Sequence, residues 1–484
     1  MAINGIGSGM DISGMVKALV GAESAPKTAQ LDRLEKTSTS KVSALGQFRS
    51  ALSTFQTALG KLNDPTLFEK RSATSSAADT VSISADAKAV AGKYNVQVFN
   101  LAQTSKVALG GVDNATDPLG SGKLTINVGE ESLDIDLTDA SLSDIRDAIN
   151  SAGKDSGLSA TIVSDPSGAS GARLVLSSTT SGTGNDISVA VSGDAPGDLS
   201  QLAFAPAAGS EVDFEPTATD SDPRAARVIS YSRDANLAID GINMSSASNT
   251  VDDAIEGVSL TLNKAQTAEA LAKAETINLG VSEDKAGVRK SITNFVDAYN
   301  SMFDSVKKLT SVTPVGGDDS EPLAAALVGD SSVRAFMSAM RSELGATSDT
   351  EGIRILSDLG ITTQRDGKLA LDNTKMNKAL DNNFEQVNAF FTGDKGLMAR
   401  LDSKVSPYTD KGGVLESRTK ALQNTISGVD EQRETHAARI SKLESRLFSQ
   451  FNAMDMLISQ MNSTSSFLTS QLDSLPGVVK QNNR

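Results

Sequence analysis

Few side chains in this sequence could do covalent chemistry. It has no cysteine and one histidine, His436. Disulfides, thiolate nucleophiles and cysteine-zinc sites are therefore excluded, and a Ser/His/Asp triad would have to be built around His436. That histidine lies in a strongly helical polar stretch, where a solvated helix position is the expected environment. We predict that the protein is not an enzyme and holds no cofactor and no metal.

The N-terminal glycines are spaced like part of a phosphate-binding loop. Gly5, Gly7 and Gly9 alternate with other residues, but Met10 stands where the third glycine of a dinucleotide fingerprint would be. No strand pattern precedes them and no Gly-Lys-Ser/Thr follows. A flexible terminal turn that exposes its backbone is the better interpretation.

Acidic residues outnumber basic ones. Lys and Arg total 45 and Asp and Glu total 60, so the formal net charge is −15. Such a chain is not expected to bind nucleic acid or an anionic membrane surface. Asp134 and Asp136 alternate on an expected strand and share one face, which indicates a solvated surface or at most a weak calcium contact.

Signals for membrane insertion are also missing from the sequence. No apolar run approaches the ~18 residues of a membrane span. The first basic side chain is Lys17, and glycines and polar residues stand where a secretory signal would have its apolar region. We expect any export to use a route without a cleaved signal peptide.

An apolar stripe with coiled-coil spacing lies near the N-terminal end. It belongs to a helix expected from Leu31 to Leu62, which Asn63, Asp64 and Pro65 end. Its members are Leu31, Leu34, Leu45, Phe48, Leu52, Phe55, Leu59 and Leu62. Ser38 and Lys41 interrupt the stripe and weaken its middle.

A longer stripe lies near the C-terminal end, in a helix expected from about Leu415 to Gln471. That helix would be on the order of 80 Å long at ~1.5 Å per residue. Residues seven apart form the stripe: Ile440, Leu447, Met454, Met461, Leu468 and Leu475. Both stripes fit an intramolecular helix pair and an intersubunit contact equally well, and both arrangements can hold together.

Between the two ends the apolar period changes to two, which is typical of strands. Two separated groups of strands, in residues 73–105 and 228–282, are expected to form one sheet domain, with a tight hairpin at Asp240 and Gly241. Residues 106–227 carry their own strand pattern and read as an inserted domain. Ser141 and Asp144 resemble a capping box that opens a short helix there.

These patterns predict an α+β multidomain fold. Both chain ends form a long helical coiled-coil stalk, and two nested β-rich head domains lie between them. The expected divisions are an N-terminal flexible or helical segment 1–40, a helical leg 41–72 plus 283–425, a β-rich head 73–105 plus 228–282, an inserted β-rich head 106–227, and a C-terminal coiled-coil helix 426–484.

Several stretches resemble the flagellar filament cap family, also called hook-associated protein type 2. They read GIGSGMDI at 5–12, ANLAIDGINM at 235–244, NTVDDAIEGVSLTL at 249–262, FVDAYNSM at 295–302 and QFNAMDMLISQMNSTSS at 450–466. The strands and helix from Ile126 to about Ile187 resemble the insertion motif of flagellins and hook-associated proteins. The matched stretches occur in the family's order along nearly the whole chain.

The resemblance implies a protein at the distal tip of the bacterial flagellar filament, outside the cell. There it would promote flagellin polymerisation and prevent loss of unpolymerised flagellin. The implied partners are other copies of the chain in a ring, expected to be a pentamer, flagellin, and a flagellar export chaperone on the C-terminal helix. Export would use the flagellar secretion apparatus.

We assign assembly or partner binding to the start motif and to the two stripes. The residues are Gly7, Gly9, Met10, Asp11, Leu45, Leu52, Leu59, Ile440, Leu447, Met454, Met461 and Leu468. The alternative function is an adhesin that binds host mucin or glycans through the head domains, also as a second role of a cap.

Overall fold

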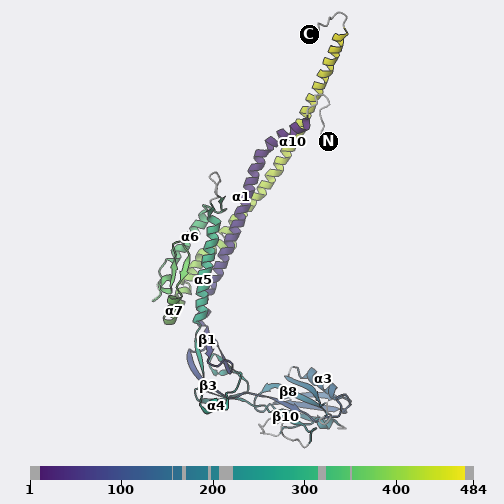
Figure 1. Cartoon of the computed structure of the whole chain (residues 1–484), viewed down its shortest axis with the longest axis vertical. Coiled ribbons are helices and arrows are strands. Elements are labelled where there is room, and N and C mark those ends of the chain that lie inside the picture. The colour runs from purple at the N-terminus through teal and green to yellow at the C-terminus, as the bar shows by residue number, and fades with distance from the viewer. Residues whose placement is uncertain are drawn as a thin grey trace, which may run out of the picture. The chain divides into compact units, whose positions relative to one another are not determined.

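The computed structural model describes residues 11–154, 156–165, 171–193, 198–206, 222–313, 323–348 and 352–474. The chain divides into two compact units, Met1–Leu67 with Ala286–Arg484 and Phe68–Lys285. The first unit is mainly helical and the second is built from sheets (Figure 1). The predicted α+β class, with a helical stalk and several β-rich domains, is confirmed.

Long helices dominate the first unit. They are α1 (Ile12–Leu62), α5 (Lys285–Thr310), α6 (Ser331–Leu344), α7 (Asn373–Asn382), α8 (Phe384–Phe391), α9 (Leu397–Thr409) and α10 (Val414–Asp473), with a 3₁₀ turn η2 (Leu356–Leu359) and the short strands β16 (Val312–Thr313), β17 (Leu323–Ala324), β18 (Ile361–Thr363) and β19 (Leu369–Leu371). The short helix α2 (Thr66–Glu69) crosses the boundary between the units.

Helix α1 begins well before the apolar pattern indicated. The carboxylate of Asp11 caps it by accepting a hydrogen bond from the Gly14 backbone N–H at 2.8 Å. Pro26 lies inside the helix without ending it, although its ring nitrogen has no proton to donate to the preceding turn. Contact with α10 supplies the stability that the local sequence lacks, because α1 and α10 lie side by side along most of α1 (Figure 1).

The lower part of α1 is buried in the core of its own unit. Leu45, Leu52 and Leu59 are buried there. Neighbouring aromatic side chains join α1 to two other helices: the Phe55 and Tyr299 ring centroids lie 6.0 Å apart, and those of Phe48 and Phe336 lie 5.6 Å apart. This half of the N-terminal stripe therefore packs against α5 and α6 within the same chain.

Eight strands of the second unit form a pair of sheets. The first sheet has the order β1 (Arg71–Ser75), β15 (Ile277–Glu283), β3 (Gly92–Asn100), β11 (Ala235–Ile239) and β12 (Ile242–Ser246), and the second has β13 (Thr250–Ile255), β14 (Val258–Leu262) and β2 (Val81–Ala85); α4 (Ala268–Ala272) lies nearby in sequence. The predicted hairpin is confirmed, since Asp240 and Gly241 join β11 to β12 with φ of +45° and +81°.

A separate core lies under the remaining strands of this unit. One sheet has the order β10 (Arg227–Ser230), β4 (Thr104–Ala108), β8 (Ala172–Ser181) and β7 (Leu158–Ser164), and the other has β6 (Glu131–Leu137), β5 (Gly122–Val128) and β9 (Ile187–Ser192), accompanied by α3 (Leu142–Ala152) and the 3₁₀ turn η1 (Asp198–Leu202). Helix α3 starts with the predicted capping box of Ser141 and Asp144. Buried side chains from both sheets and α3 form one cluster.

The alternating acids of β6 lie on the surface. Asp134 pairs with Lys123 at 2.7 Å and accepts a hydrogen bond from the Thr125 hydroxyl at 2.7 Å. The Lys123 hydrogen bond is the main cause that lowers the pKa of the Asp134 carboxyl. This is the solvated surface that the sequence indicated. Within the described residues no three His, Cys, Asp or Glu side chains are grouped so as to hold a metal ion.

Candidate assembly surface on the terminal helices

Helices α1 and α10 run antiparallel and are joined by ion pairs. Arg439 lies 3.0 Å from Glu23, and Arg433 lies 2.5 Å from both Asp32 and Glu35. These two carboxylates raise the pKa of the Arg433 guanidinium, with the hydrogen bond to Asp32 as the larger cause. Exposed pairs of this kind contribute little to stability because solvent screens them, so their main effect is to fix the register of the two helices.

Apolar side chains fill the interface where the helices touch. Ile12, Val16 and Leu31 of α1 and Val429 of α10 are buried. Ser38, one of the two predicted interruptions, is buried as well, which gives the pair a polar site in its middle. The C-terminal stripe is thus partly covered by the chain's own N-terminal helix.

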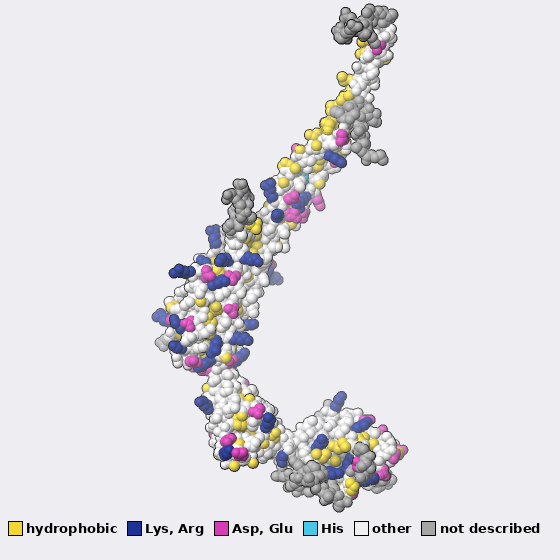
Figure 2. Space-filling view, viewed as in Figure 1, with side chains coloured by type: hydrophobic (Ala, Val, Ile, Leu, Met, Phe, Trp, Pro, Cys, Tyr) yellow, Lys and Arg dark blue, Asp and Glu magenta, His cyan; other side chains and the backbone are white. Residues whose placement is uncertain are grey.

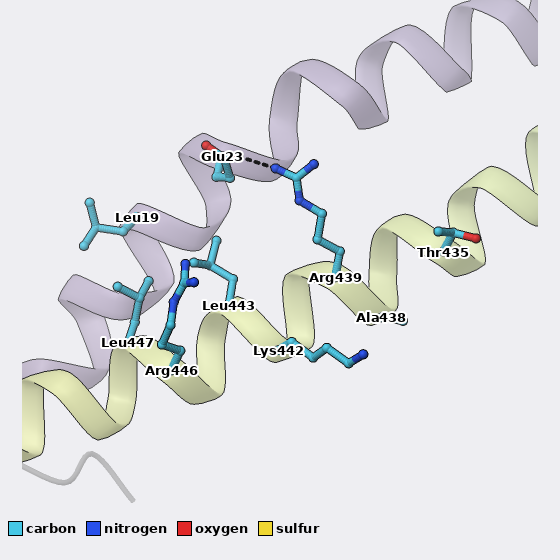
Figure 3. Close-up of a pocket in the computed structure, with 9 residues that line it drawn as sticks. All are labelled: Leu19, Glu23, Thr435, Ala438, Arg439, Lys442, Leu443, Arg446 and Leu447. Carbon is cyan, nitrogen blue, oxygen red and sulfur yellow. Dashed lines mark hydrogen bonds and ion pairs between the residues drawn. The ribbon is translucent and has the colours of Figure 1, made fainter.

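The two helices leave a groove between them near the start of α1. It has a volume of about 1010 Å³ and is lined by Leu19, Glu23, Thr435, Ala438, Arg439, Lys442, Leu443, Arg446 and Leu447. Figure 3 shows Leu19 of α1 beside Leu443 and Leu447 of α10, with Arg439 reaching across to Glu23. The lining combines apolar side chains of both helices, the paired Glu23 and Arg439, and the basic side chains of Lys442 and Arg446.

His436 lies beside this groove and is not fully solvated. It lines a second cavity of about 650 Å³ together with Pro26, Lys27 and Arg439 among others. Its Nε2 atom is buried and has no hydrogen-bond partner within the described part of the chain. His436 was expected at a solvated helix position and is instead half-buried. The sequence pattern did not indicate that α1 extends far enough to lie opposite this histidine.

Helix α10 continues past the N-terminal end of α1 (Figure 1). We call residues 456–473 the overhang. From Met461 to Ser474 every residue is exposed, and Met461 has 70% of its surface in contact with solvent. Yellow side chains follow this part of the molecule in Figure 2. The exposed large apolar residues of α10 in this region are Met454, Met456, Leu457, Met461, Phe467, Leu468 and Leu472.

An apolar face runs along the overhang and the helical turn before it. At ~3.6 residues per turn, Met454, Leu457, Met461, Leu468 and Leu472 fall on one side of the helix. Met456 and Phe467 are eleven residues apart and share the opposite side. Both faces leave large apolar side chains exposed within the described part of the chain.

The structure separates the predicted assembly residues into groups. Gly7, Gly9 and Met10 lie outside the described residues. Asp11 caps α1, and Leu45, Leu52 and Leu59 are buried in the first unit's own core, where they present nothing to a partner. Ile440 and Leu447 are half-buried between α1 and α10, and Met454, Met461 and Leu468 are exposed.

Sequence reasoning missed Leu19, Met456, Phe467 and Leu472. The seven-residue repeat selects one seam and overlooks apolar residues on other sides of the helix. Leu19 could have been found from its spacing to Met15 and Ile12, had the helix been extended through Pro26.

No helix within the described residues is both long and apolar enough to span a membrane.

Comparison with protein families identifies the chain's relatives. A family model described as the flagellar hook-associated protein 2 N-terminus matches residues 8–105, and one described as its C-terminus matches residues 232–463. A third, the flagellin hook IN motif, matches residues 123–180, within the strands around α3. The resemblance inferred from the sequence is thereby confirmed.

Individual relatives agree with the family models. The B-type flagellar hook-associated protein 2 of Pseudomonas aeruginosa is 44% identical over 98% of this chain and 97% of its own length. The flagellar hook-associated protein 2 of Escherichia coli K12 is 31% identical, with 97% of each chain covered.

A solved structure has the same fold over most of the chain. The D1-D2-D3 domains of the flagellar cap protein FliD from Escherichia coli align with a TM-score of 0.58 and 28% identity, covering 78% of this chain and 99% of that chain. With matches at both ends and close relatives along its whole length, this chain belongs to the flagellar hook-associated protein 2 family.

Proposed function

We propose that this chain caps the distal tip of the bacterial flagellar filament, where it promotes flagellin polymerisation and prevents loss of unpolymerised flagellin. The family supports the location, since a relative of known structure is named a flagellar cap protein. The observation that carries the mechanism is the exposed apolar face of the α10 overhang. The family is one of structural flagellar proteins, so the work of this chain is mechanical.

The overhang and the groove can hold a partner and release it. Burying one Leu or Met side chain contributes roughly 1.5–3 kcal/mol, so a few such contacts hold a helix in place without making release impossible. The basic side chains of Lys442 and Arg446 add attraction to acidic segments. Exchange between partners follows from contacts that are individually weak.

The partners that we propose use the same surface at different stages. A flagellar export chaperone would cover the C-terminal helix in the cytosol, and copies of this chain, as a ring of five, and flagellin would cover it at the tip. Export through the flagellar apparatus without a cleaved signal belongs to this proposal. We keep the division into leg, two heads and terminal helix as its working scheme.

The adhesin alternative has no support. The relatives and the structure reported above are named for the flagellum and not for adhesion. We therefore set it aside.

The test uses Met461→Asp with Leu468→Asp, which puts two carboxylates on the exposed apolar face of the overhang. Purified protein is added from outside to cells that lack the gene, so that a defect in export cannot mimic a defect in capping. We expect the wild-type chain to restore filament growth and the double variant not to. The control is Ser466→Asp, an exposed position of α10 that lies between its two apolar faces. Normal filaments with the double variant would refute the proposal.

A further inference from the structure

The methionines of this chain divide sharply by exposure. Of those described, Met302, Met337, Met340, Met376 and Met398 are buried in the first unit and Met244 is half-buried. The exposed ones are Met15 at 41%, Met454 at 43%, Met456 at 73% and Met461 at 70%. Three of these four lie within eight residues on α10, at the start of the overhang.

No thiol in this chain competes for an oxidant, because the sequence has no cysteine. Thioethers are then the most readily oxidised sulfur groups, and exposure decides which of them react. The two most exposed, Met456 and Met461, are therefore expected to react first.

We infer that Met454, Met456 and Met461 form a site of oxidative modification, and that the reagent class is a hypohalous acid. In the reaction a sulfur–oxygen bond forms while the oxygen–halogen bond breaks. Sulfur is oxidised by one electron pair, the halogen is reduced to halide by the same pair, and the hypohalous acid proton is released to water. The product is methionine sulfoxide, which is polar and chiral where the thioether was apolar.

The position of these residues gives the modification a consequence. Met454 and Met461 lie on the apolar face with Leu457 and Leu468, and Met456 shares the other face with Phe467. Sulfoxides there place strong hydrogen-bond acceptors where a partner would bury apolar surface. This consequence rests on the proposed function. Each sulfoxide on the apolar face should weaken the association of the overhang with a partner by roughly tenfold.

The site assignment is tested on the full chain. At a concentration below that at which it self-associates, the protein is treated with increasing amounts of hypochlorite, quenched, digested and mapped by mass spectrometry. Met456 and Met461 should gain oxygen at roughly ten times the rate of Met302, Met340, Met376 and Met398, or faster, because the buried residues react only after local opening. Equal rates at exposed and buried methionines would overturn the assignment.

The consequence is tested with Met454→Leu, Met456→Leu and Met461→Leu combined, which keeps the apolar faces but removes the reactive sulfur. Oxidised wild-type chain should lose self-association in light scattering, and the triple variant should keep it. Met15→Leu is the matched control, because it removes an exposed methionine outside α10 and should leave the wild-type sensitivity unchanged. Loss of association in the oxidised triple variant would overturn the consequence.

Two readouts distinguish this inference from the proposed function. If the untreated chain forms no oligomer, the ring in the proposed function fails, while the mapping still decides whether the site exists. Methionine sulfoxide reductase should return the oxidised wild-type chain to its original association, which irreversible damage elsewhere would not allow.

Discussion

At the scale of single residues, Asp330 joins two helices of the first unit. Its carboxylate caps α6 by accepting hydrogen bonds from the Ser332 and Val333 backbone N–H groups at 3.0 and 3.2 Å. It also accepts hydrogen bonds from Nη1 and Nη2 of Arg418 on α10, at 2.9 and 2.5 Å. The hydrogen bond from Arg418 is the main reason why the pKa of Asp330 is lowered.

This arrangement predicts a pH-dependent contribution to stability. Because the folded-state pKa of Asp330 lies below the unfolded value of about 3.9, the contribution is present above that value and is lost as pH falls through the folded pKa. Asp330→Asn keeps a capping residue but loses the charge, so near neutral pH it should lower the free energy of unfolding by about 1–2 kcal/mol. Denaturant titrations at neutral pH and near pH 3 measure the unfolding free energies of the wild-type chain and of Asp330→Asn. The difference between the two proteins should be smaller at the lower pH.

The control for this prediction is Asp304→Asn. Asp304 pairs with Lys368 at 2.8 Å but half of its side chain is exposed, so its loss should change stability by less than about 0.5 kcal/mol. Equal effects of the two substitutions would show that the Asp330 pair has no special importance.

Gly367 is a second position where a small substitution should change stability. Its φ is +94°, and an added Cβ would lie 2.8 Å from the Phe303 ring. Its carbonyl also accepts a hydrogen bond from the buried Tyr299 hydroxyl at 3.2 Å. Gly367→Ala should therefore cost about 2–4 kcal/mol of unfolding free energy, measured by chemical denaturation.

Gly393 separates backbone strain from the clash. It also has a positive φ, +80°, but no atom lies within 4 Å of the Cβ position. Gly393→Ala should cost only the left-handed backbone penalty, on the order of 1 kcal/mol. If both alanine variants lose the same stability, the contact with Phe303 is unimportant.

At the scale of elements, the sequence predicted what local signals encode. The C-terminal helix was expected from about Leu415 to Gln471 and runs from Val414 to Asp473. Its long repeat, the Asp240–Gly241 turn and the Ser141 capping box are all set by residues close in sequence, so they could be read directly.

Features that depend on tertiary contacts could not be read in the same way. Residues 12–30 contain Gly14, Gly21 and Pro26, which locally disfavour a helix. The contact that stabilises this helix comes from α10, which is hundreds of residues away in sequence. The heptad pattern also does not reveal which partner covers it. Leu52 and Met461 occupy equivalent stripes, yet one is buried in its own unit and the other is exposed.

The overhang leads to a prediction about where α10 matters for folding. A chain that ends at Ser459 loses only residues that are exposed within the described structure. Its unfolding free energy should stay within about 0.5 kcal/mol of the wild-type value, whereas self-association should fall. A deletion from residue 420 is the contrasting variant, because it also removes Arg433, Arg439 and the rest of the helix that pairs with α1. Thermal denaturation and light scattering report the two properties, and a strongly destabilised short deletion would contradict the prediction.

At the scale of the whole molecule, the chain is divided so that each unit has its own core. The second unit, residues 68–285, contains two buried clusters that include no residue of the first unit. We expect residues 68–285 expressed alone to fold and to unfold cooperatively by circular dichroism.

A matched fragment tests whether the boundary is correct. A fragment of residues 75–285 lacks most of β1, which pairs with β15 from Arg71↔Glu283 to Ser75↔Leu279. It should be less stable than the 68–285 fragment, because β15 keeps β3 as its neighbour but becomes an edge strand with its other side unpaired. Equal melting temperatures would mean that β1 contributes nothing to this unit.

The offset at which α1 and α10 pair leaves the end of α10 extending past the start of α1, and so sets how far α10 reaches. The overhang of 18 residues, 456 to 473, spans about 27 Å at ~1.5 Å per residue. Insertion of one more seven-residue repeat would move its end outward by about 10 Å while every apolar side chain keeps its face. The number of residues in the overhang therefore sets how far α10 extends, whereas the types of its exposed side chains set its affinity for a partner. The length and the affinity can change independently.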